Sequence, residues 1–193
     1  MLGADSEAML HTVTETVLSY EAADFTEWSS GRRERWVTGE VPAHVSNQPT
    51  YHFGEYFVLA DYAKRGWAGH RFYALGDWEP RNPKLVAGRA DVARCFPKNL
   101  LARFRRARVE CGRATGAGEP DLFLFAAHGQ TLFLEVKMKS DRVSGAQLEC
   151  LVQIRGILRS EIGIVYLRET RQSYKPKRYE LDLSTFSGKR VDA

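Results

Sequence analysis

The stretch GEPDLFLFAAHGQTLFLEVK, residues 118–137, contains two short apolar runs separated by a His-Gly pair. Runs of this length joined by a turn-forming pair are typical of two antiparallel strands in a hairpin. Side chains alternate between the two faces of a strand, so Glu135 and Lys137 share one face at the end of the second run. The segment therefore predicts an apolar hairpin that carries two charges side by side at one end.

The register of this hairpin decides whether Asp121 lies beside the two charges. A loop of residues 127–129, with its glycine in the left-handed conformation, would place Asp121 opposite Glu135. A two-residue loop, 128–129, would instead place Asp121 opposite Val136, on the other face of the sheet. Only the longer loop brings the two carboxylates together.

Two carboxylates and an ammonium group at one strand end would form a hard oxygen site for Mg²⁺ or Mn²⁺. Such an ion would neutralise a phosphate oxygen and lower the pKa of a bound water, while Lys137 would orient that water and balance charge on the attacked phosphorus. The simpler interpretation of these three residues alone is that Glu135 and Lys137 lie on a solvated strand face and Asp121 lies in a turn after Pro120.

The segments on either side of the hairpin alternate between helical and strand-like patterns of apolar residues. Gly66 is placed to end one helix and Pro97 to begin another. This order predicts an α/β fold with a sheet covered by helices. The elements expected are helices over residues 6–20 and 51–67, from Pro97, and from about Ser144, with strands over residues 70–75 and 162–167.

The composition is that of one globular unit, with 193 residues of which 44% are hydrophobic. No apolar run approaches the roughly 20 residues that a membrane helix needs. Because Asp5, Glu7 and Glu15 stand where an export signal would be basic and then apolar, we expect a cytoplasmic protein. The three cysteines form no Cys-x-x-Cys pair, and we expect them to be buried or idle thiols.

The net charge of +4 is unevenly distributed. Residues 98–113 hold six basic side chains against one acidic one, and residues 168–178 hold five against one. Both segments could contact phosphates, or each could be an ordinary solvated face.

From Gly118 onward, the chain contains an ordered set of motifs that resembles the motifs of a known family. Gly118, Pro120 and Asp121 fit a G-x-P-D signature, residues 135–137 read E-V-K, and residues 141–147 read D-x-x-S-x-x-Q. Over roughly residues 118–167 the chain resembles the PD-(D/E)XK nuclease superfamily, and most closely its VRR-NUC family. The resemblance implies a restriction-endonuclease-like fold, in which a mixed β-sheet core is flanked by helices, here with a basic helical insertion.

The resemblance also implies roles for individual residues. Asp121 and Glu135 would bind Mg²⁺ or Mn²⁺, Lys137 would position the attacking water, and Gln147 would lie near the metal while also completing a capping box with Ser144. Glu55 would supply a further carboxylate from the helix before the first strand, with Glu110 as the alternative. The expected contacts to nucleic acid are Arg103, Arg105, Arg106, Arg108, Lys139 and Arg142.

The implied organisation has three parts. Residues 1–50 would form an N-terminal helix and an irregular extension, residues 51–170 the nuclease-like core with an insertion at 76–117, and residues 171–193 a basic tail. His52 and His128, close to the expected site, show no zinc-ligand spacing and are expected to be incidental.

The function implied is metal-dependent endonuclease cleavage of DNA by in-line hydrolysis, since no nucleophile of the Ser-His-Asp kind accompanies the site. Small relatives suggest cleavage of branched or Holliday-type junctions by a homodimer, and a restriction-like, repair or phage-defence role is also open. The alternatives are a nucleic-acid-binding or partner-docking module of the same fold that does not cut, and a metal-dependent hydrolase with another substrate, which the two basic segments disfavour.

Overall fold

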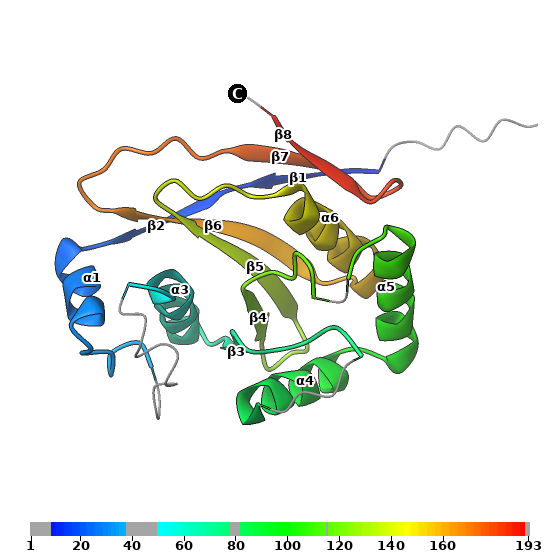
Figure 1. Cartoon of the computed structure of the whole chain (residues 1–193), viewed down its shortest axis with the longest axis horizontal. Helices are drawn as coiled ribbons and strands as arrows, with labels where there is room; N and C mark the ends of the chain where they lie inside the picture. The colour runs from blue at the N-terminus through cyan, green and yellow to red at the C-terminus, as the bar shows by residue number, and fades with distance from the viewer. Residues whose placement is uncertain (1–8, 38–49, 78–81, 115, 192–193) are drawn as a thin grey trace, which may run out of the picture.

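The computed structural model describes residues 9–37, 50–77, 82–114 and 116–191 (Figure 1). The strands are β1 (Leu10–Thr14), β2 (Thr16–Tyr20), β3 (Ala68–His70), β4 (Leu122–Phe125), β5 (Thr131–Met138), β6 (Glu161–Glu169), β7 (Arg178–Asp182) and β8 (Ser187–Val191). The helices are α1 (Ala22–Ser29), α3 (Phe53–Lys64), α4 (Pro83–Cys95), α5 (Lys98–Glu110) and α6 (Gly145–Gln153), with a π-helical turn η1 (Ile154–Leu158) after α6.

The core is a mixed five-stranded sheet with the strand order β2-β6-β5-β4-β3. Its central strands β5 and β6 are parallel, as are β6 and β2, whereas β4 runs antiparallel to both β5 and β3. The connection between β5 and β6 is α6 followed by η1, which is the helical crossover that a parallel pair requires. The expected restriction-endonuclease-like fold, a mixed sheet flanked by helices, is confirmed. Helices α4 and α5 occupy the segment expected to be a basic helical insertion, and its being an insertion stays a prediction.

Each face of this sheet is covered by helices, because alternate side chains of β4, β5 and β6 are apolar on both sides. Phe123, Phe133 and Ile164 belong to the core that includes α5 and α6. Leu134 and Val165 belong to the opposite core, which is filled by aromatic residues from α1 and α3. In Figure 1, α5 and α6 accordingly lie to one side of the central strands, and α1 and α3 to the other.

The hairpin has the longer loop that the site requires. Leu122 pairs with Leu134, and Ala126 donates its N–H to the carbonyl of Gln130, 2.9 Å away. Gly129 adopts a left-handed φ of 78° at the end of the loop. This register continues to put residue 121 opposite residue 135, as the three-residue loop predicts.

The predicted helix over residues 6–20 is wrong for the part of it that the structure describes. Residues 10–14 and 16–20 are β1 and β2, which lie in different sheets and are separated only by Glu15. β-Branched Thr and Val make up much of these two strands, and such residues favour extended backbone. The apolar spacing also fits strands, because Val13 is buried in the core that includes α5 and α6, and Tyr20 in the opposite core.

The predicted strand over residues 70–75 is displaced. Strand β3 ends at His70, and Gly69 packs so closely on β4 that a Cβ there would lie 2.4 Å from a side-chain carbon of Leu124. After His70 the chain leaves the sheet, and the Tyr73 hydroxyl donates to the carbonyl of Pro120 at 2.5 Å. The helix predicted over residues 51–67 is present as α3, and Gly66 follows it with a φ of 85°.

Helix α5 is amphipathic as predicted, but its arginines are not equivalent. Arg108 is buried, with its side chain 3% exposed, and it pairs with Glu149 of α6 at 2.9 Å. It also donates to Gln153 and to the carbonyl of Ala117. The prediction that Arg108 contacts nucleic acid is therefore wrong, because a guanidinium enclosed by three partners cannot reach a phosphate.

The other arginines of α5 that were expected to contact nucleic acid are more accessible. Arg105 is partly engaged, since it donates to the carbonyl of Leu75 and pairs with Asp77 at 2.9 Å. Arg103 and Arg106 lie on the exposed side of the helix, where contact with nucleic acid stays a prediction.

No described helix is both long enough and apolar enough to span a bilayer.

Candidate active site

The site lies where β5 loses one of its two neighbours. Strand β4 begins at Leu122, whereas β5 stays paired with β6 as far as Met138. Pro120, which has no N–H to donate, precedes the start of β4. In place of a strand, the carboxylate of Asp121 accepts the N–H of Val136 at 2.8 Å, so this side chain extends the ladder and is fixed by it.

Gly118 allows the loop before Asp121 to approach α6. Its φ is 72°, and a Cβ built on it would lie 2.5 Å from the carbonyl oxygen of Ala146 in the first turn of that helix. Two features thus require a glycine at this position of the G-x-P-D signature: the left-handed backbone and the close approach to the helix that carries Gln147.

Replacement of Gly118 by Ala is expected to destabilise the protein by about 2–4 kcal/mol. The left-handed backbone alone costs about 1–2 kcal/mol for an L residue, and the clash with Ala146 adds to it. Gly116→Ala is a matched control, because Gly116 has a φ of 91° but an added Cβ would meet no atom of the described residues within 4 Å. Chemical denaturation of both variants measures the difference, and equal losses would show that the close approach costs nothing.

Glu135 is fully buried on β5 and has two partners at one oxygen. Its Oε1 lies 2.6 Å from Nζ of Lys137 and accepts Nε2 of Gln147 at 2.5 Å. Its Oε2 has no hydrogen-bond partner among the residues that the structure describes. One carboxylate oxygen is therefore held in place, while the other, once ionised, is unsatisfied in a buried setting, which is costly unless a proton or a cation binds it.

Gln147 serves the helix and the site together. Its Oε1 accepts the N–H of Ser144 at 2.9 Å, and the Ser144 hydroxyl accepts the N–H of Gln147 at 3.3 Å. This is the capping box that the sequence predicted. Because the amide oxygen is used by the cap, the amide nitrogen is directed at Glu135.

Glu55 approaches from the other layer, at the first turn of α3. Its Oε1 lies 2.8 Å from Nδ1 of His52 and 3.3 Å from Nη2 of Arg71. Burial alone would raise the pKa of Glu55, but the hydrogen bond to His52 and the charge of Arg71 outweigh it and leave the pKa below its usual value. Glu55 is thus held ionised by two residues that sequence reasoning did not assign to the site.

Sequence reasoning missed His52 and Arg71 for different reasons. His52 is not incidental, since it directly precedes α3 with a left-handed φ of 64° and contacts Glu55. Arg71 reaches the site because the chain turns away after β3, and its guanidinium packs over Tyr56 and Phe72. No spacing in the sequence links Arg71 to Glu55, whereas a polar residue just before a helix could have drawn attention to His52.

The ionised carboxylates of Asp121 and Glu135 repel one another. Burial first, and then the charge of Asp121, raise the pKa of Glu135 to about 9, against the lowering effect of Lys137. Burial also raises the pKa of Asp121, although its hydrogen bond from Val136 opposes this. Two neighbouring carboxyls that both resist ionisation form a pair that additional positive charge would stabilise.

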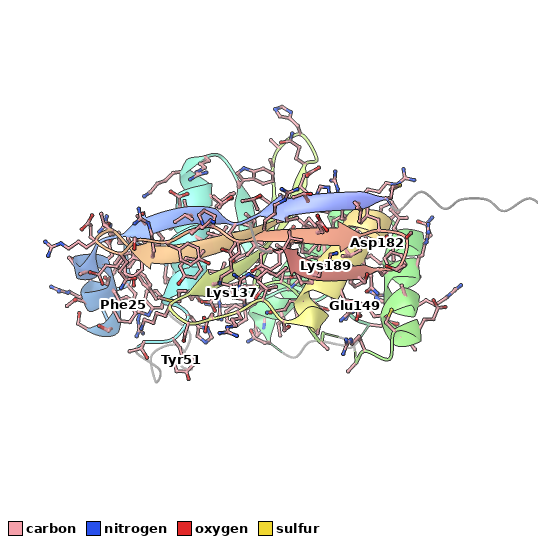
Figure 2. All side chains as sticks on the ribbon, turned by 90° about the horizontal axis from the view of Figure 1, so that it is seen from above. Phe25, Tyr51, Lys137, Glu149, Asp182 and Lys189 are labelled. Atoms are coloured by element: carbon pink, nitrogen blue, oxygen red, sulfur yellow. The ribbon has the colours of Figure 1, made fainter. Side chains whose placement is uncertain are left out.

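These groups open into a common cleft. Glu55, Asp121, Glu135, Lys137 and Gln147 line a cleft of about 460 Å³. Figure 2 places Lys137 near the middle of the molecule, with Tyr51, which also lines the cleft, at its edge. Lys139 lines the cleft too, while Arg142 is exposed just beyond it; Glu110, the alternative to Glu55, is exposed at the end of α5 and does not line it.

The residues of the cleft supply some, but not all, of the ligands that a hard divalent cation needs. The unpartnered Oε2 of Glu135 beside the carboxyl of Asp121 supplies two oxygen ligands of the kind that Mg²⁺ and Mn²⁺ prefer. Within the described ranges, however, no three His, Cys, Asp or Glu side chains already converge as a metal site. Glu55 is instead engaged by His52 and Arg71, so as a third ligand it would have to turn toward the strands.

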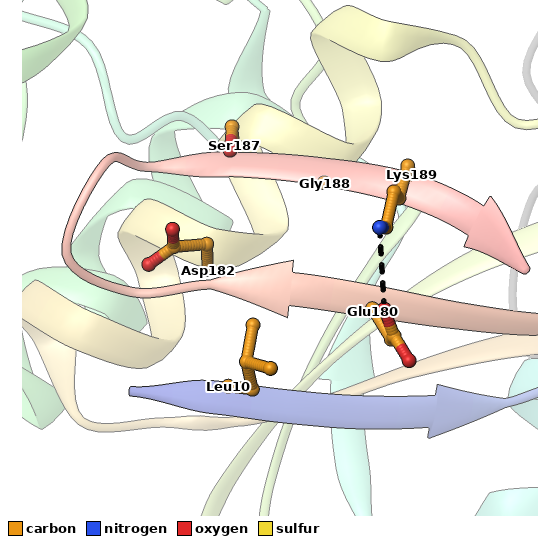
Figure 3. Close-up of a pocket in the computed structure, with 6 residues that line it drawn as sticks. All are labelled: Leu10, Glu180, Asp182, Ser187, Gly188 and Lys189. Carbon is orange, nitrogen blue, oxygen red and sulfur yellow. Dashed lines mark ion pairs between the residues drawn. The ribbon is translucent and has the colours of Figure 1, made fainter. Parts of the chain in front are cut away.

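A second hollow, of about 260 Å³, lies on the three-stranded sheet β1-β7-β8, away from these carboxylates (Figure 3). Its ion pair joins Lys189 and Glu180 at 3.6 Å, and these residues are directly opposite one another on β8 and β7. Asp182 accepts hydrogen bonds from Ser184. The charges in this hollow are those of ordinary cross-strand and turn pairs, so it is not a candidate site.

Part of the chain is similar to a known protein family. Residues 72–163 match the family model described as the VRR-NUC domain. The match contains Asp121, Glu135, Lys137 and Gln147, while Glu55 lies before its start. No curated protein matches the chain.

Proposed function

We propose that this chain, which matches the VRR-NUC family model over residues 72–163, is a divalent-metal-dependent endonuclease of the PD-(D/E)XK nuclease type that hydrolyses phosphodiester bonds in DNA. The observation that carries the proposal is the unsatisfied Oε2 of Glu135 beside Asp121, in a cleft that also holds Lys137. A buried carboxyl pair with an open oxygen is unfavourable by itself and becomes favourable when it binds a cation.

Asp121 and Glu135 would hold Mg²⁺ or Mn²⁺. When bound, the ion would supply Lewis acidity toward a phosphate oxygen and lower the pKa of a water molecule. Val136 fixes Asp121 through its N–H, and Gln147 fixes one oxygen of Glu135, so the oxygen that faces the ion needs little reorganisation. Glu55 would serve as an auxiliary ligand or hold water.

Lys137 would act on the reacting phosphate. Its side chain is 12% exposed and its ammonium lies 2.6 Å from Glu135, so it is directed into the cleft. There it would orient the attacking water and stabilise the negative charge that builds up on the phosphate oxygens in the transition state. No side chain of this set needs to form a covalent intermediate, which favours direct in-line hydrolysis.

We further propose that the protein prefers branched or Holliday-type junctions and that it acts as a homodimer. Symmetric cleavage of a four-way junction needs two active sites, and a two-fold dimer would supply them. The alternative is a protein that binds DNA through this fold without cutting it. The experiment must distinguish this alternative from a nuclease.

The test is cleavage of labelled single-stranded, duplex, flap and four-way-junction DNA with Mg²⁺, with Mn²⁺ and with EDTA. Wild-type protein is expected to cut at least one of these substrates only when metal is present. Asp121→Asn, which keeps an oxygen for the N–H of Val136, is expected to abolish cutting, whereas Asp77→Asn, at an exposed carboxylate beside α5, is not. Tight binding without cutting would favour the non-cleaving module, and metal-independent cutting would contradict the proposed chemistry.

A further inference from the structure

The connection between β6 and β7, residues 170–177, follows the strand that pairs with β5, which carries Glu135 and Lys137. Tyr166 of β6 is the register partner of Lys137, and its hydroxyl donates to the carbonyl of Lys139. The ring of Tyr174 stacks on that of Tyr166 with a centroid distance of 3.5 Å and an interplanar angle of 3°. This stack fastens the connection against the turn that follows Lys137.

A buried carboxylate fixes the other side of this connection. Glu15, between β1 and β2, is 4% exposed. It accepts the hydroxyl of Tyr174 at 2.5 Å, the N–H of Lys177 at 2.8 Å and the hydroxyl of Tyr179 at 2.9 Å. Three donors to one carboxylate make a strong anchor, so the connection is held in a defined position before any ligand arrives.

The connection carries exposed basic side chains that form no ion pair with other described residues. Arg171 and Lys175 are exposed, and neither forms an ion pair within the described part of the chain. Lys177 lies over the rings of Tyr166 and Tyr174, 5.7 and 5.5 Å from their centroids. The segment 168–178 as a whole has five basic residues and one acidic residue, Glu169.

The basic helix α5 is less well placed. Arg108 is buried and Arg105 is engaged with Asp77. No described residue of α5 lines the cleft, and none of residues 170–177 does. The connection, however, stacks through Tyr174 on Tyr166, the register partner of Lys137. Figure 1 shows α5 at the far side of α6, and Figure 2 shows Glu149, the partner of Arg108, well to one side of Lys137.

We infer that the connection of residues 170–177, with Arg171 and Lys175 as its free cations, binds the phosphate backbone of DNA next to the cleft, in preference to α5. The inference rests on the proposed function, and it identifies the surface that binds the DNA substrate outside the cleft. Because the connection is anchored at Glu15 and at Tyr166, binding phosphate there would cost little ordering of the chain.

Salt-dependent binding tests this surface. Affinity for a duplex and for a four-way junction would be measured by fluorescence anisotropy between about 0.05 and 0.2 M salt, in an Asp121→Asn background that does not cut. Two double variants with the same change in charge are compared: Arg171→Gln with Lys175→Gln, and Arg103→Gln with Arg106→Gln. Both change exposed side chains, and equal thermal unfolding midpoints would show that both proteins are folded.

The connection variant is expected to bind on the order of tenfold more weakly or worse, and to lower the slope of log K against log salt by about 1.8, which is about 0.9 for each phosphate that the protein no longer neutralises. The α5 variant is expected to change both quantities much less. A weaker affinity confined to the α5 variant, or equal weakening in both, would overturn the inference. Failure of the proposed function would look different, because wild-type protein would then cut none of the DNA substrates in any metal.

Discussion

Lys137→Met is expected to lower the rate of DNA cleavage by about 10²–10³-fold at saturating metal and substrate, which is the usual effect of removing one group that stabilises transition-state charge. The ammonium is the positive charge closest to the carboxyl pair, 2.6 Å from Glu135. Methionine keeps much of the volume of the side chain but supplies no hydrogen bond to water or to phosphate. The effect should therefore appear in kcat, measured as the single-turnover rate, more than in the affinity for DNA.

Metal binding separates a catalytic role of Lys137 from a structural one. Without the ammonium, the carboxyl pair has less positive charge nearby, so the affinity for Mn²⁺ should stay the same or increase. Lys64→Met, at the exposed end of α3, is the matched control and should cleave at the wild-type rate. If Lys137→Met cut DNA within about threefold of the wild-type rate, the assigned role would be wrong; if it lost both metal binding and cleavage, Lys137 would be holding the site together.

The hairpin could be predicted from the sequence because its determinants are local. Alternation of side chains fixes which residues share a face, whereas the choice between a two-residue and a three-residue loop is made by the structure, in which Ala126 donates its N–H to Gln130. Once the register was known, the position of Asp121 opposite Glu135 followed. The capping box of Ser144 and Gln147 was predictable for the same reason, since its members are three residues apart.

The rest of the site depends on contacts between distant parts of the chain. Arg71 reaches Glu55 because β3 ends at His70, and the buried position of Arg108 exists because α6 supplies Glu149. Neither contact leaves a periodic pattern in the sequence. A basic helix therefore looked like a phosphate-binding surface, although part of its charge is used to hold α5 against α6.

The N-terminal strands β1 and β2 could not be predicted from the sequence for a different reason. The apolar residues of residues 10–20 satisfy a helical spacing and a strand pattern almost equally well. The choice is made by partners far along the chain, because β1 pairs with β7 and β2 pairs with β6. β-Branched composition favoured strands, but tertiary pairing decided the outcome.

The second large effect expected is on the dependence of stability on pH. The pKa of Glu135 is about 9 in the folded protein, against 4.5 for the free side chain, because of its burial and the charge of Asp121. Between those values the folded state holds a proton that the unfolded state has lost, so metal-free protein should lose stability as the pH rises from about 4.5 to about 9. A single such group contributes a slope of up to about 1.4 kcal/mol per pH unit, and the raised pKa of Asp121 acts in the same direction.

Glu135→Gln should remove most of this slope, because glutamine cannot ionise and still accepts a hydrogen bond. Chemical denaturation of the metal-free variant at several pH values should therefore give a flatter curve than that of wild-type protein, with greater stability than wild type near pH 8. Glu27→Gln, at a side chain that is 40% exposed, is a control that should leave the slope unchanged. A wild-type curve that rises with pH in this range would contradict the buried, proton-holding carboxyl.

Metal should reverse the loss of stability, and only where the carboxyl pair is intact. A cation that binds the folded protein at about 100 times its Kd stabilises it by about 2.7 kcal/mol, and the gain should increase with pH because the ion replaces the proton on Glu135. Glu135→Gln should therefore gain little from Mn²⁺ at any pH, although it is the more stable protein without metal. If Mn²⁺ stabilised the variant as much as wild type, the ion would bind elsewhere, and the unpartnered oxygen beside Asp121 would need a different explanation.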